Sequence, residues 1–125
     1  MEKKKILIIE DESTLQRALS EFLSLEGFAV ANALDGERGV EMAKKENPDL
    51  ILLDIILPKK DGYEVVDDLK SEESTKDIPI ILLTNLETTE NVNRAFEKGI
   101  TTYLVKSDYK LEEIVAKIKE TLKLS

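Results

Sequence analysis

Acidic, hydroxyl and ammonium side chains follow the short aliphatic runs of this sequence. They are Glu10, Asp11, Glu12, Asp54, Thr84 and Lys106. Asp54 is the only charged residue in the stretch LILLDIILP, which covers residues 50–58. In an open parallel sheet, the residues that follow the strands gather at one edge. If the aliphatic runs are strands, several carboxylates, a hydroxyl and an ammonium group therefore converge at that edge.

A cluster of carboxylates at such an edge requires neutralisation. Two carboxylates about 4 Å apart repel each other by ~4 kcal/mol at an effective dielectric constant of about 20. Lys106 supplies one positive charge, and a divalent metal ion would supply the rest. Ligand sets made of oxygen alone favour Mg²⁺, Mn²⁺ or Ca²⁺, and a site with open positions for a phosphoryl group favours Mg²⁺. We therefore predict a Mg²⁺ site, with Mn²⁺ as an alternative, and a phosphate chemistry.

The residue types exclude several other chemistries. The chain has no histidine and no cysteine, which excludes zinc–thiolate sites, disulfides and an imidazole general base. An FMN site or a P-loop would need glycine, serine or threonine after the first strand, where this chain has three acids. A phosphatase of the haloacid dehalogenase type would need a second aspartate two residues after Asp54, where Ile56 stands.

Length and charge limit the kind of protein. A chain of 125 residues predicts a single domain over residues 1–125. The net charge of −8, from 26 acidic and 18 basic residues, argues against a nucleic-acid partner. No aliphatic run approaches the ~18 residues of a membrane span, and the N-terminal stretch MEKKKILIIEDE lacks the features of a signal peptide. We therefore predict a cytoplasmic protein without membrane contact.

Short aliphatic runs predict the strands. They are KILII (5–9), FAVAN (28–32), LILL (50–53), IPIILL (78–83) and TTYLV (101–105). Four of these runs do not alternate apolar with polar residues, which is typical of strands covered on both faces. The run at residues 28–32 is the weakest, and it predicts an edge strand.

Apolar stripes at helical spacing predict the first and the last helix. The first stripe contains Leu15, Ala18, Leu19, Phe22 and Leu23, and the last contains Leu111, Ile114, Val115, Ile118 and Leu122. Ser13 and Gln16 are placed as a capping box of the first helix, and Gly27 stands just past its end. Ser107 or Asp108 is placed to cap the last helix.

Three further helices are predicted between the remaining strands. They cover residues 36–45, between Asp35 and Pro48, residues 62–70, and residues 89–98, which Gly99 terminates. Strands thus alternate with helices along the whole chain, with short loops and no linker. This alternation predicts a three-layer α/β/α sandwich around a parallel sheet.

Four fragments of the sequence resemble a known family. ILIIEDE, DLILLDIILPKKDG, IPIILLT and TTYLVK occur in this order between Lys5 and Leu122, at the spacing of one domain. Together they resemble the receiver (response regulator) domains of two-component signalling, of which the chemotaxis protein CheY is a stand-alone example. The resemblance implies a five-stranded parallel sheet of strand order 2-1-3-4-5, which is the flavodoxin-like order of CheY.

The resemblance implies a role for each residue at the strand ends. Asp54 is similar to the phosphoacceptor, which takes a phosphoryl group from a phosphohistidine of a histidine kinase or a phosphotransfer protein. Glu10 and Asp11 are similar to the acidic pair that holds Mg²⁺, with Asp54 and the backbone carbonyl of Ile56 as further ligands. Lys106 is similar to the lysine that neutralises phosphoryl charge. Such a domain catalyses its own phosphorylation and dephosphorylation, and it is not a conventional turnover enzyme.

The resemblance also implies a switch. Thr84 is similar to the hydroxyl that bonds a phosphoryl oxygen in the active state, and Tyr103 is similar to the ring that turns inward as this threonine moves. Both would couple the site to the face of the fourth helix, fifth strand and fifth helix, where a downstream protein partner would bind. Leu15 and Ala18 lie on the strip of the first helix that meets the kinase in this family, although periodicity alone would bury both.

Three residues depart from the family pattern. Glu10 replaces the more usual aspartate, and its longer side chain is expected to lengthen the reach to the metal. Asn85 follows Thr84 where a small residue is common, and we expect it to slow access by small phosphoryl donors. Ser107 follows Lys106 in place of proline, and because a cis bond before serine costs ~2.5–4 kcal/mol, we expect a trans bond.

We therefore predict a stand-alone receiver that lacks an output domain and reports phosphorylation by binding a partner. Two alternatives stay open. One is a receiver excised from a larger DNA-binding regulator or a hybrid kinase. The other is a receiver-like interaction module that never carries phosphate, against which Asp54, Thr84, Lys106 and the acidic pair argue.

Overall fold

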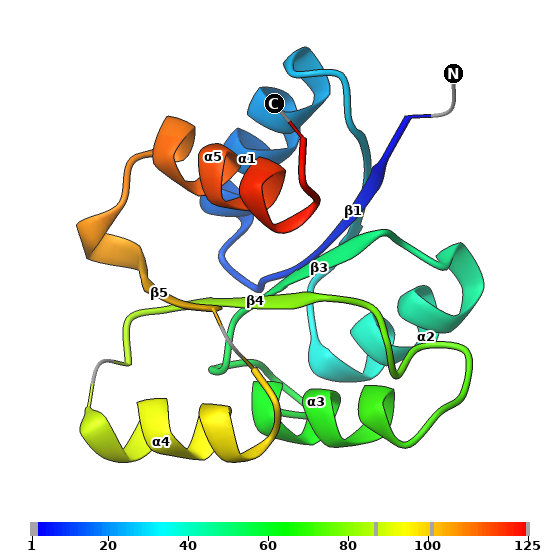
Figure 1. The fold of residues 1–125 in the computed structure, drawn as a ribbon, viewed down its shortest axis with the longest axis vertical. Helices are drawn as coiled ribbons and strands as arrows, with labels where there is room; N and C mark the ends of the chain where they lie inside the picture. Colours follow the sequence, from blue (N-terminus) through cyan, green and yellow to red (C-terminus); the bar gives the residue numbers. More distant parts are fainter. Residues whose placement is uncertain (1–2, 87, 101, 125) are drawn as a thin grey trace.

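Strands and helices alternate along the chain (Figure 1). The computed structural model describes residues 3–86, 88–100 and 102–124. The strands are β1 (Lys5–Ile9), β2 (Ala29–Ala33), β3 (Leu50–Leu53), β4 (Ile80–Thr84) and β5 (Thr102–Val105). The helices are α1 (Ser13–Leu25), α2 (Gly36–Glu46), α3 (Gly62–Lys70), α4 (Thr89–Glu97) and α5 (Leu111–Thr121), and a short 3₁₀ helix, η1 (Lys106–Asp108), precedes α5.

Within the described residues, the strands form one parallel sheet in the order β2-β1-β3-β4-β5. The predicted strand order is confirmed, and so is the edge position of the second strand. Because the strands all run the same way, their carboxyl ends lie at one edge of the sheet. The polar residues singled out above lie at that edge, because they end or follow the strands.

Helices cover both faces of the sheet. α1 and α5 lie on one face, and α2, α3 and α4 lie on the other (Figure 1). Ile6 and Ile8 of β1 pack on the side of α1 and α5, whereas Leu7 and Ile9 pack on the opposite side. The residues of β3 are all buried. The unbroken run LILL is therefore a central strand covered on both faces, and the predicted three-layer sandwich is confirmed.

The ends of α2, α3 and α4 agree with the prediction to within one residue. Asp35 caps α2, because its side chain accepts a hydrogen bond from the N–H of Arg38 (2.8 Å). Gly99 follows α4 with a φ of 88°, a left-handed value that favours glycine after a helix.

The predicted capping box of the first helix is wrong. α1 begins at Ser13, and the side chain of the preceding Glu12 makes no capping hydrogen bond. The Gln16 amide donates instead to the backbone carbonyls of Glu10 (3.2 Å) and Ala33 (3.0 Å). Gln16 therefore joins α1 to the chain that leaves β1 and β2, because those carbonyls lie within its reach only in the folded sheet.

The predicted caps of the last helix are also wrong. Ser107 and Asp108 belong to η1, so neither stands at the N-cap of α5, which is Lys110. α5 follows Lys110, whose backbone N–H donates to the side chain of Glu113 (2.9 Å).

Two strands start later than predicted. β2 begins at Ala29 and β4 begins at Ile80. In front of β4, Pro79 has no N–H to donate, although its carbonyl accepts from the N–H of Ile51 (3.0 Å). Thr101, the predicted start of the last strand, lies outside the described residues.

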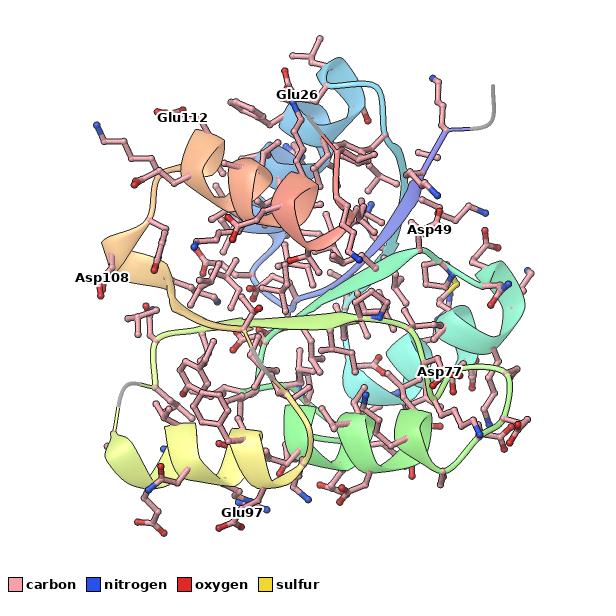
Figure 2. The ribbon with its side chains drawn as sticks, viewed as in Figure 1. Glu26, Asp49, Asp77, Glu97, Asp108 and Glu112 are labelled. Carbon is pink, nitrogen blue, oxygen red and sulfur yellow. The ribbon has the colours of Figure 1, made fainter. Side chains whose placement is uncertain are left out.

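Charged side chains cover the outside of the fold. Figure 2 shows Glu97, Asp108 and Glu112 pointing away from the body of the protein, and all three are exposed. None of the described helices combines the length and the apolar character needed to cross a bilayer.

Candidate functional site

Polar side chains from several strand ends meet at the carboxyl edge of the sheet. Backbone hydrogen bonds continue just past the strands, from the N–H of Glu10 to Ala33 (3.1 Å) and from the N–H of Asp54 to Ile9 (3.0 Å). These hydrogen bonds fix the backbone positions of Glu10 and Asp54. Glu10 is only 3% exposed and Asp54 only 5%, so both carboxylates need partners within the protein.

Lys106 is the partner that the two buried carboxylates share. Its Nζ lies 2.7 Å from Oε1 of Glu10 and 2.8 Å from Oδ2 of Asp54. The Glu12 carboxylate lies further away, at 3.8 Å, and is more exposed. Lys106 follows β5 while its partners follow β1 and β3, so the sheet order brings together charges that are far apart in the sequence.

Backbone N–H groups bind the remaining oxygens of the two acids. Oδ1 of Asp54 accepts from the N–H of Ile56 (3.2 Å), and Oε2 of Glu10 accepts from the N–H of Glu12 (3.0 Å). One ammonium group nevertheless faces two buried carboxylates. The site therefore keeps an excess of negative charge, which favours a further cation.

Burial and pairing act in opposite directions on the pKa values of the site. Burial raises the pKa of Glu10, and hydrogen bonds from Lys106 and the N–H of Glu12 only partly offset this effect. For Lys106, burial by itself would lower the pKa, but the hydrogen bonds to Asp54 and Glu10 outweigh it and raise the pKa. Lys106 is therefore a fixed positive charge at neutral pH.

Three carboxylates are close enough to share a metal ion. One oxygen each from Glu10, Asp11 and Asp54 lie within 4.8 Å of one another, and Asp11 is exposed while the other two are buried. The donor set is made of oxygen alone, which fits Mg²⁺ or Mn²⁺. Ile56, predicted to add its backbone carbonyl, stands two residues after Asp54 with an exposed side chain.

Thr84 and Tyr103 are joined through one backbone residue. The side chain of Thr84 is fully buried, and its Oγ1 accepts a long hydrogen bond from the N–H of Leu86 (3.4 Å). The carbonyl of Leu86 accepts a hydrogen bond from the hydroxyl of Tyr103. Burial raises the pKa of Tyr103 to about 12. The segment after β4 is therefore held between the site and β5.

Tyr63 is a residue that the sequence interpretation missed. It is only 3% exposed, and its hydroxyl lies 2.8 Å from Oδ1 and 3.0 Å from the backbone oxygen of Asn91 in α4. The guanidinium of Arg94 stacks over its ring at 4.0 Å. The available signal was a tyrosine on the apolar stripe of a helix, because a buried tyrosine hydroxyl usually finds a partner.

The remaining predicted residues lie around this centre. Leu15 and Ala18 are both half-buried on α1, and Leu15 packs against the core under α1 and α5. Asn85 is exposed directly after Thr84. The Lys106–Ser107 bond is trans, as predicted.

An open parallel sheet of this strand order, with an acidic cluster and a lysine at its carboxyl edge, is a CheY-like, flavodoxin-type fold. Residues 6–119 match the family model of the response regulator receiver domain. The chain therefore belongs to the receiver domains of two-component signalling.

Similar proteins include transcriptional regulators. The probable transcriptional regulator ycf27 of Porphyridium aerugineum is 39% identical over 123 residues, which are 98% of this chain and 50% of that protein. The DNA-binding dual master transcriptional regulator RpaA of Synechocystis is 37% identical over 119 residues, which are 95% of this chain and 49% of that protein. The chain thus spans about half the length of these relatives.

The fold is also similar to solved structures. The crystal structure of a CheY-like response regulator receiver domain protein from Methanospirillum hungatei superposes with a TM-score of 0.90 at 26% identity. The match covers 98% of this chain and 95% of that one.

Proposed function

We propose that this receiver domain accepts a phosphoryl group on Asp54 from a histidine kinase or a phosphotransfer protein, in a Mg²⁺-dependent reaction. The observation that carries the proposal is the surroundings of Asp54. Its carboxylate contacts Lys106 at 2.8 Å and shares a cluster of oxygen ligands with Glu10 and Asp11. A nucleophile, a fixed cation and a metal-type ligand set thus lie at one place, which is what phosphoryl transfer requires.

In the proposed transfer, a carboxylate oxygen of Asp54 attacks the phosphorus of a phosphohistidine. An O–P bond forms, the P–N bond breaks, and its electron pair stays on the imidazole nitrogen of the donor. The product is an acyl phosphate on Asp54, which water later hydrolyses to the carboxylate and inorganic phosphate. Because this chain contains no histidine, the donor imidazole belongs to the partner protein.

Side chains around Asp54 share the work of charge neutralisation. Glu10, Asp11, Asp54 and the backbone carbonyl of Ile56 are the proposed ligands of Mg²⁺, which when bound neutralises charge on the phosphoryl oxygens. Lys106 contacts the Asp54 carboxylate before transfer. After transfer, an N–H of its ammonium group can donate a hydrogen bond to a phosphoryl oxygen. Its raised pKa keeps it protonated for this role.

We propose that Thr84 and Tyr103 couple phosphorylation of Asp54 to the surface of the protein. The Thr84 hydroxyl can donate to a phosphoryl oxygen, since among the described residues it accepts a long hydrogen bond from the N–H of Leu86 and donates none. If the Thr84 hydroxyl moves toward the phosphoryl group, Leu86 moves with it. The Leu86 carbonyl, which accepts the hydrogen bond of the Tyr103 hydroxyl, is then displaced. We therefore propose that a downstream protein binds on the face of α4, β5 and α5, where the side chain of Phe96 is 55% exposed. Leu15 and Ala18 are proposed to contact the kinase.

Phosphorylation by acetyl phosphate with Mg²⁺, measured by intact mass, tests this function. The wild type should gain one phosphoryl group, Asp54→Asn should gain none, and removal of Mg²⁺ with EDTA should abolish the gain. Asp77→Asn is a matched control, because Asp77 is exposed in the turn before β4 (Figure 2), at the amino end of that strand, whereas the site lies at the carboxyl ends. A wild type that responds to neither acetyl phosphate nor beryllofluoride would favour an interaction module that carries no phosphate.

The domain is proposed to act in one of two settings. The first is a stand-alone receiver over residues 1–125 that binds a protein partner. The second is the receiver half of a DNA-binding regulator, which is favoured because RpaA is named as DNA-binding and this chain matches only 49% of its length. An immunoblot of the native protein with an antibody against this domain separates the two settings. A band near 14.1 kDa favours the stand-alone receiver, and a band of about twice that mass favours the DNA-binding regulator.

A further inference from the structure

Gly36, the first residue of α2, touches the loop that follows Asp54. Its N–H donates to the carbonyl of Pro58 (3.3 Å). A Cβ atom at this position would overlap the carbonyl oxygen of Lys60 and lie 2.7 Å from its carbonyl carbon. Because the obstacle is backbone, no rotation of a side chain could relieve the overlap. Only glycine permits this approach.

The loop at residues 55–61 is held tightly on its other side as well. The N–H of Gly62 donates to Ile55 (2.7 Å), and the N–H of Lys60 donates to Pro58 (2.7 Å). Lys59, between Pro58 and Lys60, has a φ of 67°, a value that residues other than glycine rarely adopt. A strained conformation of this kind persists only where its surroundings enforce it. The contact with Gly36 is one of those constraints.

The same loop reaches the proposed site through Ile56. The N–H of Ile56 donates to Oδ1 of Asp54 (3.2 Å), and its carbonyl is a proposed metal ligand. Ile56 stands only two residues before Pro58. A displacement of residues 58–60 would therefore move both the donor that orients Asp54 and the proposed ligand.

We propose that Gly36 is a positioning residue for metal binding and phosphoryl transfer, because the first turn of α2 holds the loop that carries Ile56. The chemical consequence rests on the proposed function, whereas the effect on the loop does not. Alanine is otherwise a better residue than glycine in a helix. A loss caused by Gly36→Ala would therefore come from the contact with Lys60 and not from α2 itself.

Two glycine variants test this inference. Gly36→Ala inserts a methyl group against the loop, whereas Gly27→Ala places one where no atom lies within 4 Å but where φ is 94°. Gly27→Ala is therefore the matched control for a general loss of stability by strain. Hydrogen exchange of the Lys60 and Gly62 amides is measured without metal, and the Mg²⁺ concentration for half-maximal labelling by acetyl phosphate is measured separately.

Gly36→Ala should speed exchange at Lys60 and Gly62 and raise the half-maximal Mg²⁺ concentration by about tenfold or more, as loss of a support for metal ligands does. Gly27→Ala should change neither quantity when the two variants are compared at equal global stability. The inference would be overturned if both variants had equal effects. It would also be overturned if the wild type labelled normally and Gly36→Ala behaved like the wild type. Failure of the wild type to label would instead contradict the proposed function and leave the exchange comparison as the test.

Should Gly36→Ala fail to fold, the wild type still provides a test. Addition of Mg²⁺ should slow exchange of the Gly36 amide along with those of Lys60 and Gly62, although Gly36 is not a ligand. Protection of Lys60 and Gly62 without protection of Gly36 would show that α2 does not support the loop.

Discussion

Among single residues, Glu10 carries the clearest electrostatic conflict of the metal-free protein. Burial raises its pKa above the ordinary value of 4.5. A group whose pKa is raised in the folded state contributes stability that is fully present below its unfolded pKa and is lost as the pH rises through its folded pKa. The ionised carboxylate of Glu10 therefore lowers the free energy of unfolding at neutral pH, and a bound cation would relieve this effect.

This conflict predicts that Glu10→Gln stabilises the metal-free protein at pH 7. The amide keeps the size of the side chain and removes the buried charge, so stability should also fall less between pH 4 and pH 7, the range that begins near the ordinary pKa of about 4.5. Urea unfolding in EDTA at several pH values measures the effect. Glu41→Gln is a suitable control, since Glu41 is exposed on α2. A lower free energy of unfolding for Glu10→Gln at pH 7 would contradict this account.

At the scale of elements, α3 and α4 are joined by Tyr63. Its hydroxyl bonds Asn91, and the Asn91 amide donates in turn to Oγ1 of Thr88 (2.8 Å), the residue that caps α4. The start of α4 is thus tied to α3 on one side, while Tyr103 holds Leu86 on the other. Two tyrosine hydroxyls therefore bond residues on either side of the connection between β4 and α4, Leu86 before it and Asn91 after it.

Tyr63→Phe should loosen the first turn of α4. Loss of this partly buried hydrogen bond should lower the free energy of unfolding by about 0.5–1.5 kcal/mol, and amides of residues 91–94 should exchange faster. Tyr109→Phe provides the control, because Tyr109 is half-buried and packs on the other face of the sheet. Unchanged exchange in α4 of Tyr63→Phe would show that the Tyr63 hydroxyl does not hold this helix.

For the whole molecule, the net charge of −8 and the acidic cluster both predict stabilisation by Mg²⁺. An ion that binds only the folded state stabilises it by about 2.7 kcal/mol at a hundred times its dissociation constant. Thermal unfolding should therefore shift to higher temperature as Mg²⁺ is added, and less so for Asp11→Asn. KCl at matched ionic strength separates this binding from screening of surface charge. Equal shifts with KCl and Mg²⁺ would mean that no specific site contributes.

Several features could be predicted from local sequence because they depend on neighbouring residues. Periodicity and apolar runs predicted the order of strands and helices, and Asp35 and Gly99 marked real helix ends. The cap of α1 could not be predicted in this way. Gln16 had a suitable local partner in Ser13, but the carbonyls of Glu10, just after β1, and of Ala33, at the end of β2, came within its reach once the sheet had formed.

The sequence alone determined the fold class, and it placed an acid, a hydroxyl and a lysine at successive strand ends, because those features follow from residue type and spacing. Only the tertiary structure decided which groups touch. The shared contact of Lys106 with Glu10 and Asp54, the bond from Tyr63 to Asn91, and the approach of Gly36 to Lys60 join residues that are distant in the chain. Such contacts depend on the register of the sheet and the packing of helices across it, which no local pattern encodes.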